Sequence, residues 1–556
     1  MRIWHIVKPL GEVLLAVLVI LAVTLIPAKT GSTPGVEQSL SNAVGRQVKG
    51  YEAAGGSPLT GDASVLAKEQ DCIEKTDNPG LFKTMTPAEG IDAARTNSSP
   101  CATFTGDFAN PGNNKVLAYQ SPGQVGGTIL DAVTGGPEEL FVYCCGSGQQ
   151  AGYGVNQGHA VAKLDAKTLQ VQWKTVLDNY NASGQWTVLS GINYVAGPSG
   201  RPALMVSYGH RIAKLDPATG KLLADIDLPV GKGVDPTGVN FETTIPTPDG
   251  TVITKTQGRP ATTTSDPSSP PCTDQGFTAM VACKGKQPPS EVVAVNPDTM
   301  EILDALTLPQ QVSGRNTIGT SNGRTYIYMT GLTNEMRVQW DPDAKKLTFD
   351  KDWYPHYPQK DQTSGSAPCV LGKWVLFNTN GVPSTVSSSI VAVSQEDPKD
   401  LHRITAIPIG SAKKSFWPSK LSCDPVTNLI YQADTGVGKV AAVRLDPDTG
   451  QLTKAWGPID QRTFGFFTLL GPKNQRVVLS TKIDVTDPLT ALGVGAGVYG
   501  EQFIWRDALT GRELAHSDYV DAMSQGILPT PGYGGLAYML QSDGGVASFQ
   551  VVKASS

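Results

Sequence analysis

The sequence contains little charge and little histidine. Charged residues make up 17% of its 556 positions, against about 25% in an average soluble protein. Lys and Arg number 45 against 50 Asp and Glu, with no long basic run, which argues against nucleic-acid binding because such surfaces are usually basic. Six scattered histidines without HExxH, and eight cysteines without CxxC, predict no zinc site.

Other catalytic signatures are missing as well. The chain has no CxxCH for covalent haem, no P-loop, no dinucleotide fingerprint and no serine nucleophile elbow. Apart from Asn240 near Glu242, nothing suggests the several oxygen ligands that Ca²⁺ needs, and no metal site is predicted. What the sequence does have is 60 Gly and 40 Pro, which mark many chain reversals and short elements.

The N-terminus carries the longest apolar run. Residues 13–26 are uninterrupted apolar except for Thr24, and Arg2 and Lys8 precede them. Counted from Leu10 to Ala28 the stretch has 19 residues, which is just long enough to span a bilayer as a helix, and the preceding positive charge predicts that the bulk of the chain lies outside. We therefore expect a signal anchor over residues 1–28, with a cleaved signal peptide as the alternative. The predicted location is the cell membrane, single-pass, with a periplasmic or extracellular body.

Residues 29–100 are rich in Gly, Ser, Thr, Pro, Ala and Asn, which predicts a membrane-proximal stalk. From residue 101 onward, short β-rich runs alternate with turns. A strand–Asp/Asn–turn–strand pattern recurs about every 50 residues once a Pro/Ser/Thr-rich insertion at 262–289 is set aside. Its anchor positions are Asp165, Asp216, Asn296, Asp341, Gln395, Asp446 and Asp507.

Each copy reads as an antiparallel hairpin. Asp or Asn can bond the backbone two residues on, Pro presets φ, and Gly220 or Gly450 supplies a positive φ. Four strands per repeat of this length predict an all-β fold, a β-propeller of four-stranded antiparallel blades over residues 101–556, preceded by one N-terminal hydrophobic helix. Eight blades are favoured if an N-terminal strand near 103–109 or 115–120 completes the last blade, and seven are the alternative.

At these turns the chain resembles the quinoprotein, or PQQ-type, β-propeller superfamily, whose blades carry the motif A-x-D-x-x-T-G-x-x-x-W. Asp165, Thr168 and Trp173 keep the motif spacing, whereas Lys163 and Leu169 depart from it. The superfamily includes PQQ-dependent alcohol dehydrogenases and also cofactor-free propellers such as an outer-membrane assembly scaffold. The resemblance therefore implies the fold and leaves the activity open.

Alignment of the repeats suggests one candidate ligand site. The residues just before or near each inner strand would ring one mouth of the central channel: Gln185, Glu242, Arg315, Lys414, Trp417, Arg462 and Gln525. Arginine forks match carboxylates and a Trp can stack on a ring, so this mouth could hold a planar polyanion such as PQQ. The simpler interpretation of these residues is that propeller loops are polar in any case and that some of the side chains pair with one another.

The even number of cysteines suits disulfides in an oxidising compartment. We expect Cys72–Cys101 to fasten the stalk, Cys272–Cys283 to staple the insertion, and Cys369–Cys423 to join neighbouring blades. The adjacent Cys144 and Cys145 could form a vicinal disulfide, which several PQQ alcohol dehydrogenases carry beside the cofactor, or each could pair elsewhere.

Together these features predict a membrane-anchored extracytoplasmic propeller that binds a protein partner or a small anionic ligand, with no cofactor firmly implied. The alternative is a PQQ-dependent oxidoreductase acting on an alcohol or sugar, with PQQ and Ca²⁺ as its cofactors. The sequence leaves open whether the protein is an enzyme.

Overall fold

The computed structural model describes residues 56–121, 124–144, 158–177, 191–234, 236, 239–258, 289–312, 314–359, 362–364, 367–380, 385–411, 415, 420–485, 500–523 and 528–554. The predicted signal anchor and most of the insertion at 262–289 lie outside these residues. Within the described ranges, no helix is both long and apolar enough to cross a membrane.

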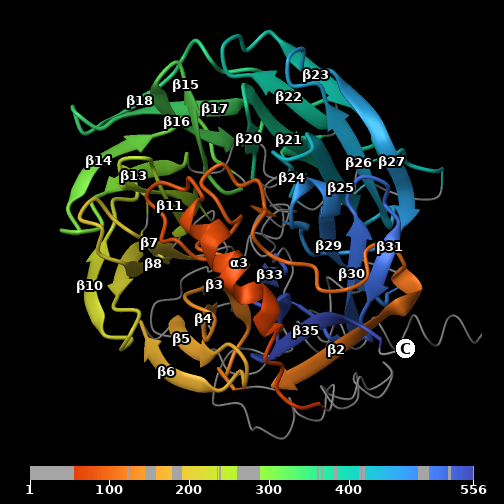
Figure 1. Ribbon diagram of the computed structural model, residues 1–556. Coiled ribbons are helices and arrows are strands. Elements are labelled where there is room, and N and C mark those ends of the chain that lie inside the picture. The colour runs from red at the N-terminus through yellow and green to blue at the C-terminus, as the bar shows by residue number, and fades with distance from the viewer. Residues whose placement is uncertain are drawn as a thin grey trace, which may run out of the picture. The chain divides into compact units, whose positions relative to one another are not determined.

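Eight sheets, mostly of four antiparallel strands, form blades around a central axis (Figure 1), and the strand β1 (Ser98–Ser99) adds in parallel to one of them. This confirms the predicted all-β propeller and its favoured blade number. Blade 1 contains β3 (Ile129–Thr134), β4 (Glu139–Cys144), β5 (Ala160–Asp165) and β6 (Val171–Val176). Blade 2 contains β7 (Ile192–Val195), β8 (Ala203–Tyr208), β9 (Arg211–Leu215) and β10 (Leu222–Asp227). Blade 3 contains β11 (Val239–Pro246), β12 (Val252–Gly258), β13 (Glu291–Val295) and β14 (Ile302–Thr307). Blade 4 contains β15 (Thr317–Ser321), β16 (Arg324–Thr330), β17 (Glu335–Asp341) and β18 (Lys346–Phe349).

The ring continues in the same order. Blade 5 contains β20 (Cys369–Leu371), β21 (Trp374–Asn380), β22 (Ile390–Ser394) and β23 (Leu401–Ile404), with β19 (Thr363–Ser364) beside β21. Blade 6 contains β24 (Ser422–Cys423), β25 (Leu429–Asp434), β26 (Lys439–Leu445) and β27 (Leu452–Asp460). Blade 7 contains β28 (Thr468–Leu470), β29 (Val477–Ile483), β30 (Gly500–Asp507) and β31 (Glu513–His516), with β32 (Val520–Asp521) beside β30.

Blade 8 closes the ring with strands from both ends of the described chain. It contains β33 (Thr530–Pro531), β34 (Leu536–Leu540), β35 (Val546–Lys553) and, as its outer strand, β2 (Asn114–Ser121). The two strands β2 and β35 pair antiparallel from Asn114 opposite Lys553 to Ser121 opposite Val546. The strand expected at 115–120 therefore completes the last blade, and the seven-blade alternative is wrong.

The repeated turns have the predicted geometry. In blade 1 the Asp165 carboxylate accepts hydrogen bonds from the backbone N–H groups of Lys167 and Thr168, at 3.0 and 2.8 Å. Gly220 and Gly450 have φ of 71° and 73° at the end of their turns, and Leu169 takes the same region with φ of 57°. The backbone thus repeats even where the motif glycine is replaced.

Tryptophans dock onto these turns from the preceding blade. Trp173 of blade 1 lies so close to Gly220 of blade 2 that a Cβ there would stand 2.5 Å from its ring. Trp456 of blade 6 packs on Gly511 of blade 7 and donates its indole N–H to the carbonyl of Ala508 at 2.9 Å. Each such contact fixes the angle between two neighbouring blades.

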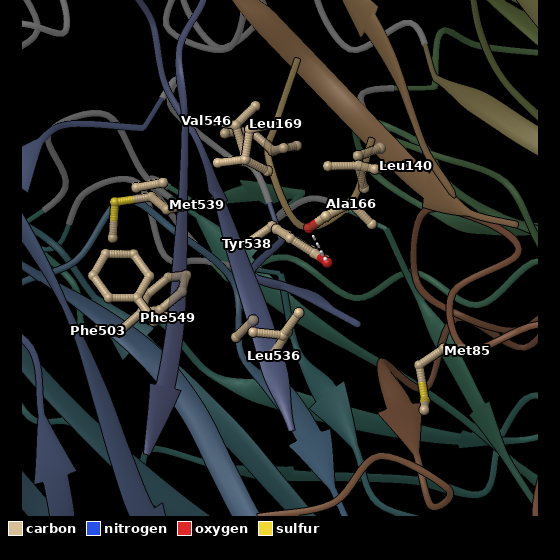
Figure 2. Close-up of a cluster of buried hydrophobic side chains, with 14 of the residues drawn as sticks. Met85, Leu140, Ala166, Leu169, Phe503, Leu536, Tyr538, Met539, Val546 and Phe549 are labelled. Atoms are coloured by element: carbon tan, nitrogen blue, oxygen red, sulfur yellow. Dashed lines mark hydrogen bonds between the residues drawn. The ribbon is translucent and has the colours of Figure 1, made fainter. Parts of the chain in front are cut away.

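The largest hydrophobic cluster lies where blades 7, 8 and 1 meet (Figure 2). It includes Phe503, Phe549 and Met539, all fully buried, whose rings and thioether fill the space between the sheets. Tyr538 donates its hydroxyl hydrogen to the carbonyl of Ala166 at 2.8 Å, so its polar end is satisfied inside this core. The blade assembled from two chain ends therefore shares a buried hydrophobic core with its neighbours.

Two of the expected disulfides are present. Cys72 in α3 (Ala63–Glu74) is bonded to Cys101, and Cys369 of blade 5 to Cys423 of blade 6. Cys144 is also disulfide-bonded, whereas Cys145, Cys272 and Cys283 lie outside the described residues. These bonds suggest an oxidising, extracytoplasmic compartment.

Candidate functional site: the closed central channel

Residues 78–102, here called the N-terminal segment, run across the inner strands of the ring. Their carbonyl groups accept hydrogen bonds from inner-strand N–H groups in six blades, at 2.7–3.1 Å: Thr134, Tyr194, Ile318, Val370, Cys423 and Leu469. In blade 8 the Thr86 hydroxyl donates to the carbonyl of Pro531, and in blade 3 Leu81 and Ala88 share a hydrophobic cluster with Ile245. Every blade thus contacts the segment.

In three blades the segment reaches the end of the inner strand. Its bonds in blades 1, 2 and 7 reach Thr134, Ala196 and Gly471, where the inner strand ends and turns into the first hairpin of the blade. The mouth predicted from the sequence lies where each inner strand begins, and the segment reaches this end too, because Glu89 pairs with Arg315 just before β15 and Asn97 accepts from Lys420 just before β24. α3, which precedes the segment, lies over the centre of the ring in the view of Figure 1.

This differs from the predicted stalk at 29–100. Its described part, from residue 56, belongs to the compact unit Gly50–Ser556. Glu69 of α3 accepts the N–H of Gly534 in blade 8 at 2.7 Å and that of Thr103 at 3.2 Å. A composition rich in Gly, Ser and Thr suggested a linker, but these small residues let the chain approach the inner strands closely.

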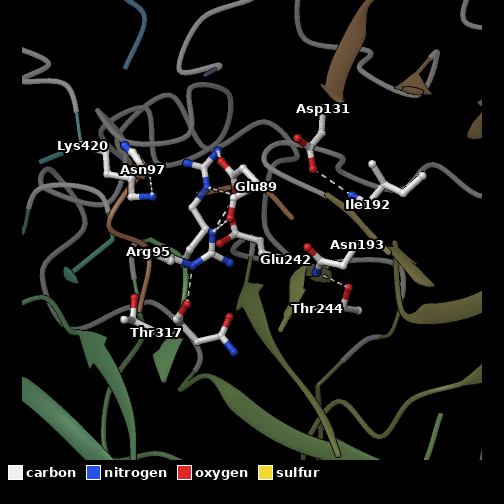
Figure 3. Close-up of polar contacts among 12 residues, drawn as sticks. Glu89, Arg95, Asn97, Asp131, Ile192, Asn193, Glu242, Thr244, Thr317 and Lys420 are labelled. Carbon is white, nitrogen blue, oxygen red and sulfur yellow. Dashed lines mark hydrogen bonds and ion pairs between the residues drawn. The ribbon is translucent and has the colours of Figure 1, made fainter. Parts of the chain in front are cut away.

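Buried charges form the floor of the channel (Figure 3). Glu89 of the N-terminal segment accepts from Arg95 at 3.0 Å and pairs with Arg315, whose Nη2 lies 2.6 Å from Glu89 Oε1. All three side chains are at most 6% exposed. Burial acts to raise the pKa of Glu89, but the charges of Arg315 and Arg95 outweigh it and lower the pKa to about 2. Glu89 is therefore an anion held between two guanidinium groups.

A second buried pair lies beside the first. Glu242 in β11 and Lys255 in β12 are 2.5 Å apart, and neither side chain is exposed. Burial raises the pKa of Glu242 to about 7, although Lys255 opposes the shift. Burial also lowers the pKa of Lys255, against the charge of Glu242. The two charges therefore neutralise each other across adjacent strands of one blade.

Lys420 and Asp131 complete the cluster. Lys420 donates to Asn97 Oδ1 at 2.8 Å, and burial followed by the charge of Arg95 holds its pKa well below the usual range. Asp131 accepts the N–H groups of Ala132 and Ile192, at 2.8 and 2.9 Å. Burial, assisted by the charge of Glu89, raises the pKa of Asp131 well above its usual range.

Of the predicted mouth residues, the structure brings Glu242 and Arg315 into this cluster. Arg462 lies apart, where it donates to the carbonyl groups of Thr435 and Val485 at 3.0 and 2.8 Å. Gln185, Lys414, Trp417 and Gln525 lie outside the described residues. Whether these seven side chains act together on a ligand stays a prediction.

Glu89, Arg95 and Lys420 were missed by the sequence analysis. Glu89 and Arg95 lie in the stretch interpreted as a stalk. The signal that could have indicated them is a group of three charged residues within seven positions of a segment otherwise poor in charge: Glu89, Asp92 and Arg95. Ile91, Arg95 and Asn97 have positive φ, of 73°, 52° and 59°, which three non-glycine residues adopt only when tertiary contacts hold them.

PQQ carries three carboxylates, and the described cations do not fit the task of holding them. Arg315 is paired with Glu89, Lys255 with Glu242, and Arg462 with two carbonyl groups. Within the described channel, Arg95 Nη2 is a buried donor that has no hydrogen-bond partner. Lys420 donates to Asn97, and the two N–H hydrogens of Arg95 Nη2 do not match three carboxylates, so no catalytic step through this cofactor is derived.

Solved structures share the fold at low sequence identity. Quinohemoprotein alcohol dehydrogenase ADHIIG from Pseudomonas putida HK5 is 12% identical over 90% of this chain and 84% of its own, with a TM-score of 0.50. The quinohemoprotein alcohol dehydrogenase from Comamonas testosteroni is 13% identical over 89% and 85%, with a TM-score of 0.49. BamB from Moraxella catarrhalis is 11% identical over 76% and 85%, with a TM-score of 0.35. The sequence matches no known family and no curated protein sequence.

Proposed function

We propose that this chain, an eight-bladed propeller with the fold of the quinoprotein-type propellers, is an extracytoplasmic binding module that presents the open end of its channel to a protein partner. The observation that carries the proposal is the set of hydrogen bonds by which the N-terminal segment crosses the inner strands, where Glu89 also occupies the cations Arg95 and Arg315. A channel closed by its own chain, with internally paired charges, leaves the rim and loops of the open end as the surface that can engage a partner.

The second part of the proposal is the attachment. Residues 1–28 anchor the chain in the cell membrane, with the propeller on the outer side, as the apolar run at 13–26 and the charges of Arg2 and Lys8 favour. Alkaline carbonate extraction of membranes tests it. The full chain is expected to stay in the membrane pellet, and a chain starting at residue 29 behind a cleavable leader is expected in the supernatant.

Site-specific photo-crosslinking tests the binding surface. A photoreactive residue replaces Lys232 or Ser411, both exposed in connections that lead into an inner strand, at the open end. The matched control replaces Lys473, which is exposed in a first-hairpin connection at the closed end. A partner that crosslinks from Lys232 and Ser411 but not from Lys473 is expected, and equal crosslinking from both ends would refute the proposal.

The oxidoreductase alternative is tested separately. The purified propeller is titrated with PQQ and CaCl₂ and assayed with an artificial electron acceptor across alcohols and sugars. We expect neither saturable binding of PQQ nor turnover. Turnover that is abolished by Arg315→Ala in a protein that remains folded would replace the binding proposal with an enzyme.

A further inference from the structure

Two buried carboxyl groups occupy equivalent places in blades 4 and 7. Glu335 is the first residue of β17 and Glu501 is the second residue of β30, and each of these strands is the third of its blade. The two residues are 0% and 1% exposed. Successive strands of a blade run in opposite directions, so both residues lie at the end of the propeller where the inner strands begin.

A connection between blades covers Glu335. Residues 353–357, which lead from blade 4 toward blade 5, lie across the start of β17, and the carbonyl of Pro355 accepts the N–H of Glu335 at 3.1 Å. Beside it, His356 forms an antiparallel bridge with Asn334. The connection is therefore bonded to the residue that carries the carboxyl group and paired with its neighbour.

The same arrangement recurs in blade 7. The short strand β32 pairs with the start of β30, with Val520 opposite Glu501. Glu501 Oε2 accepts the N–H of Met523 at 2.8 Å, so here the carboxyl group itself binds the connection. The carbonyl of Ala522 accepts the N–H of Ser542 at 3.2 Å, which joins this connection to blade 8.

Neither carboxyl group has a counter-charge. Among the described residues, no donor is in hydrogen-bond geometry with either oxygen of Glu335 or with Glu501 Oε1, and these three atoms are inaccessible to water. The ion pairs of the described chain include neither residue. By contrast, three other buried carboxylates lie 2.5–2.8 Å from an Arg or Lys nitrogen: Glu89, Glu242 and Asp424.

The titratable groups on the neighbouring elements do not supply that charge. Arg337, on β17, pairs with Asp350 at 2.8 Å. Lys482, on β29, is opposite Gln502 and so lies on the other face of the sheet from Glu501. The remaining groups are neutral or acidic side chains and one histidine: Tyr328, Tyr354, His356 and Tyr357 around Glu335, and Asp484, Tyr519 and Asp521 around Glu501.

The surroundings favour the protonated form of both groups. Burial raises the pKa of Glu335 well above its usual range and that of Glu501 to about 7. The hydroxyl groups of Thr330 and Thr481 oppose these shifts only in part. A buried carboxyl group with neither a counter-charge nor access to water is stable only while it keeps its proton, because an isolated buried charge costs several kcal/mol or more. Ionisation therefore requires the group to reach water, and at both sites the covering layer is the connection.

We propose that residues 353–357 and 520–523 are two proton-controlled latches, which lie on the third strands while Glu335 and Glu501 are protonated and leave them when these carboxyl groups ionise. The rest of each blade stays folded, since the connection is its only part that has to move. This inference is independent of the proposed binding function, because it concerns the protein alone.

The direction of the pH effect follows from the raised pKa values. A closed latch binds a proton that the open latch releases, so the closed state is most stable below the ordinary pKa of 4.5 and opens more readily as the pH rises toward the folded-state pKa. Release of one proton makes the open state about tenfold more populated per pH unit in that interval. For Glu501 the interval ends at about pH 7.

Hydrogen exchange of the full chain, followed by mass spectrometry from about pH 5 to pH 7, tests the latches. After correction for the intrinsic exchange rate, the protection of 353–357 and of 520–523 should fall about tenfold per pH unit. Glu335→Gln should make the protection of 353–357 independent of pH and leave that of 520–523 as it is. Glu501→Gln should do the reverse.

The matched control is Glu291→Gln. Glu291 begins the third strand of blade 3, but its carboxylate accepts the Thr307 hydroxyl at 2.6 Å, so its loss should alter neither latch. If Glu335→Gln folds poorly, Glu335→Met fills a similar volume without a polar group and should also abolish the pH dependence of 353–357. The slope in the native protein needs no variant. Protection that is independent of pH in the native protein, or a pH dependence that survives in the Glu335 and Glu501 variants or disappears in Glu291→Gln, would overturn the proposal.

Discussion

Glu89 is the residue on which the closed channel depends most directly. Its two carboxylate oxygens face Arg95 and Arg315 at 2.6–3.0 Å, and all three side chains are buried. In Glu89→Gln the shape is kept but two buried guanidinium groups lose their counter-charge. Removal of one partner from a buried ion pair destabilises a protein by about 3–5 kcal/mol, because the remaining charge is uncompensated in a medium of low polarity.

This free energy converts into a modest thermal shift because the unit is large. Unfolding entropy is about 2.1 cal/mol/K per residue, or roughly 1 kcal/mol per degree for the compact unit Gly50–Ser556. We therefore expect a decrease in melting temperature of about 3–5 °C at pH 7, measured by scanning calorimetry. The control is Glu138→Gln, because Glu138 pairs with Lys167 at 2.9 Å on the surface, with 71% of its side chain exposed. Its loss should be below about 1 kcal/mol.

The pH dependence provides an independent check on the same residue. The folded-state pKa of Glu89 is lowered to about 2 from an ordinary value of 4.5. The contribution of Glu89 to the free energy of unfolding is therefore fully present above pH 4.5 and lost as the pH falls toward 2. The difference in melting temperature between the native protein and Glu89→Gln should shrink over that interval. A melting temperature lowered by less than 1 °C at pH 7, or a difference independent of pH, would refute the counter-charge role of Glu89.

Three further predictions concern the rest of the ring. Burial raises the pKa of Glu501 to about 7, so this residue has no effect on the free energy of unfolding below pH 4.5 and lowers it as the pH rises to 7. In denaturant titrations, Glu501→Gln should have the same free energy of unfolding as the native protein at pH 4 and exceed it by about 3 kcal/mol above pH 7. Cys369→Ala combined with Cys423→Ala removes a bond that spans 54 residues and should cost about 2–5 kcal/mol, while the native protein under reducing conditions should lose more, because it also loses Cys72–Cys101. A chain that starts at residue 103 loses the hydrogen bonds of the N-terminal segment to six inner strands and should lack a cooperative thermal transition by circular dichroism, whereas a chain that starts at residue 56 should keep it.

The repeated part of the fold could be predicted from the sequence because its signal is local. Asp165 and Gly220 fix their turns through bonds and backbone angles that involve only nearby residues, and the turns recur at one spacing. The closing strand at 114–121 could be predicted as one of two candidates, since an incomplete last blade requires a partner strand.

The channel floor could not be predicted in the same way. Glu89 meets Arg315 across 226 residues, and Asn97 meets Ser422 across 325. Apart from the two-residue strand β1 (Ser98–Ser99) beside β28, residues 78–102 form no regular element in the described structure, because the segment bonds to a succession of blades. Arg315 was predicted at the channel mouth, but its partner Glu89, which decides whether it is available to a ligand, lies far away in the sequence.

The N-terminal segment imposes an order on biosynthesis. Residues 78–102 and strand β2 leave the ribosome or the translocon before any blade exists, yet their partners are spread over the whole ring, up to β35 at the C-terminus. The first part of the chain to be made is thus among the last to acquire its native contacts, and the nascent chain must keep it soluble while about 400 residues follow. Residues 78–102 contain few large apolar side chains, which suits a segment that stays in contact with water until its partners are made. A premature stop anywhere in the last two blades should therefore leave both ends of the chain unpaired and expose the product to proteolysis.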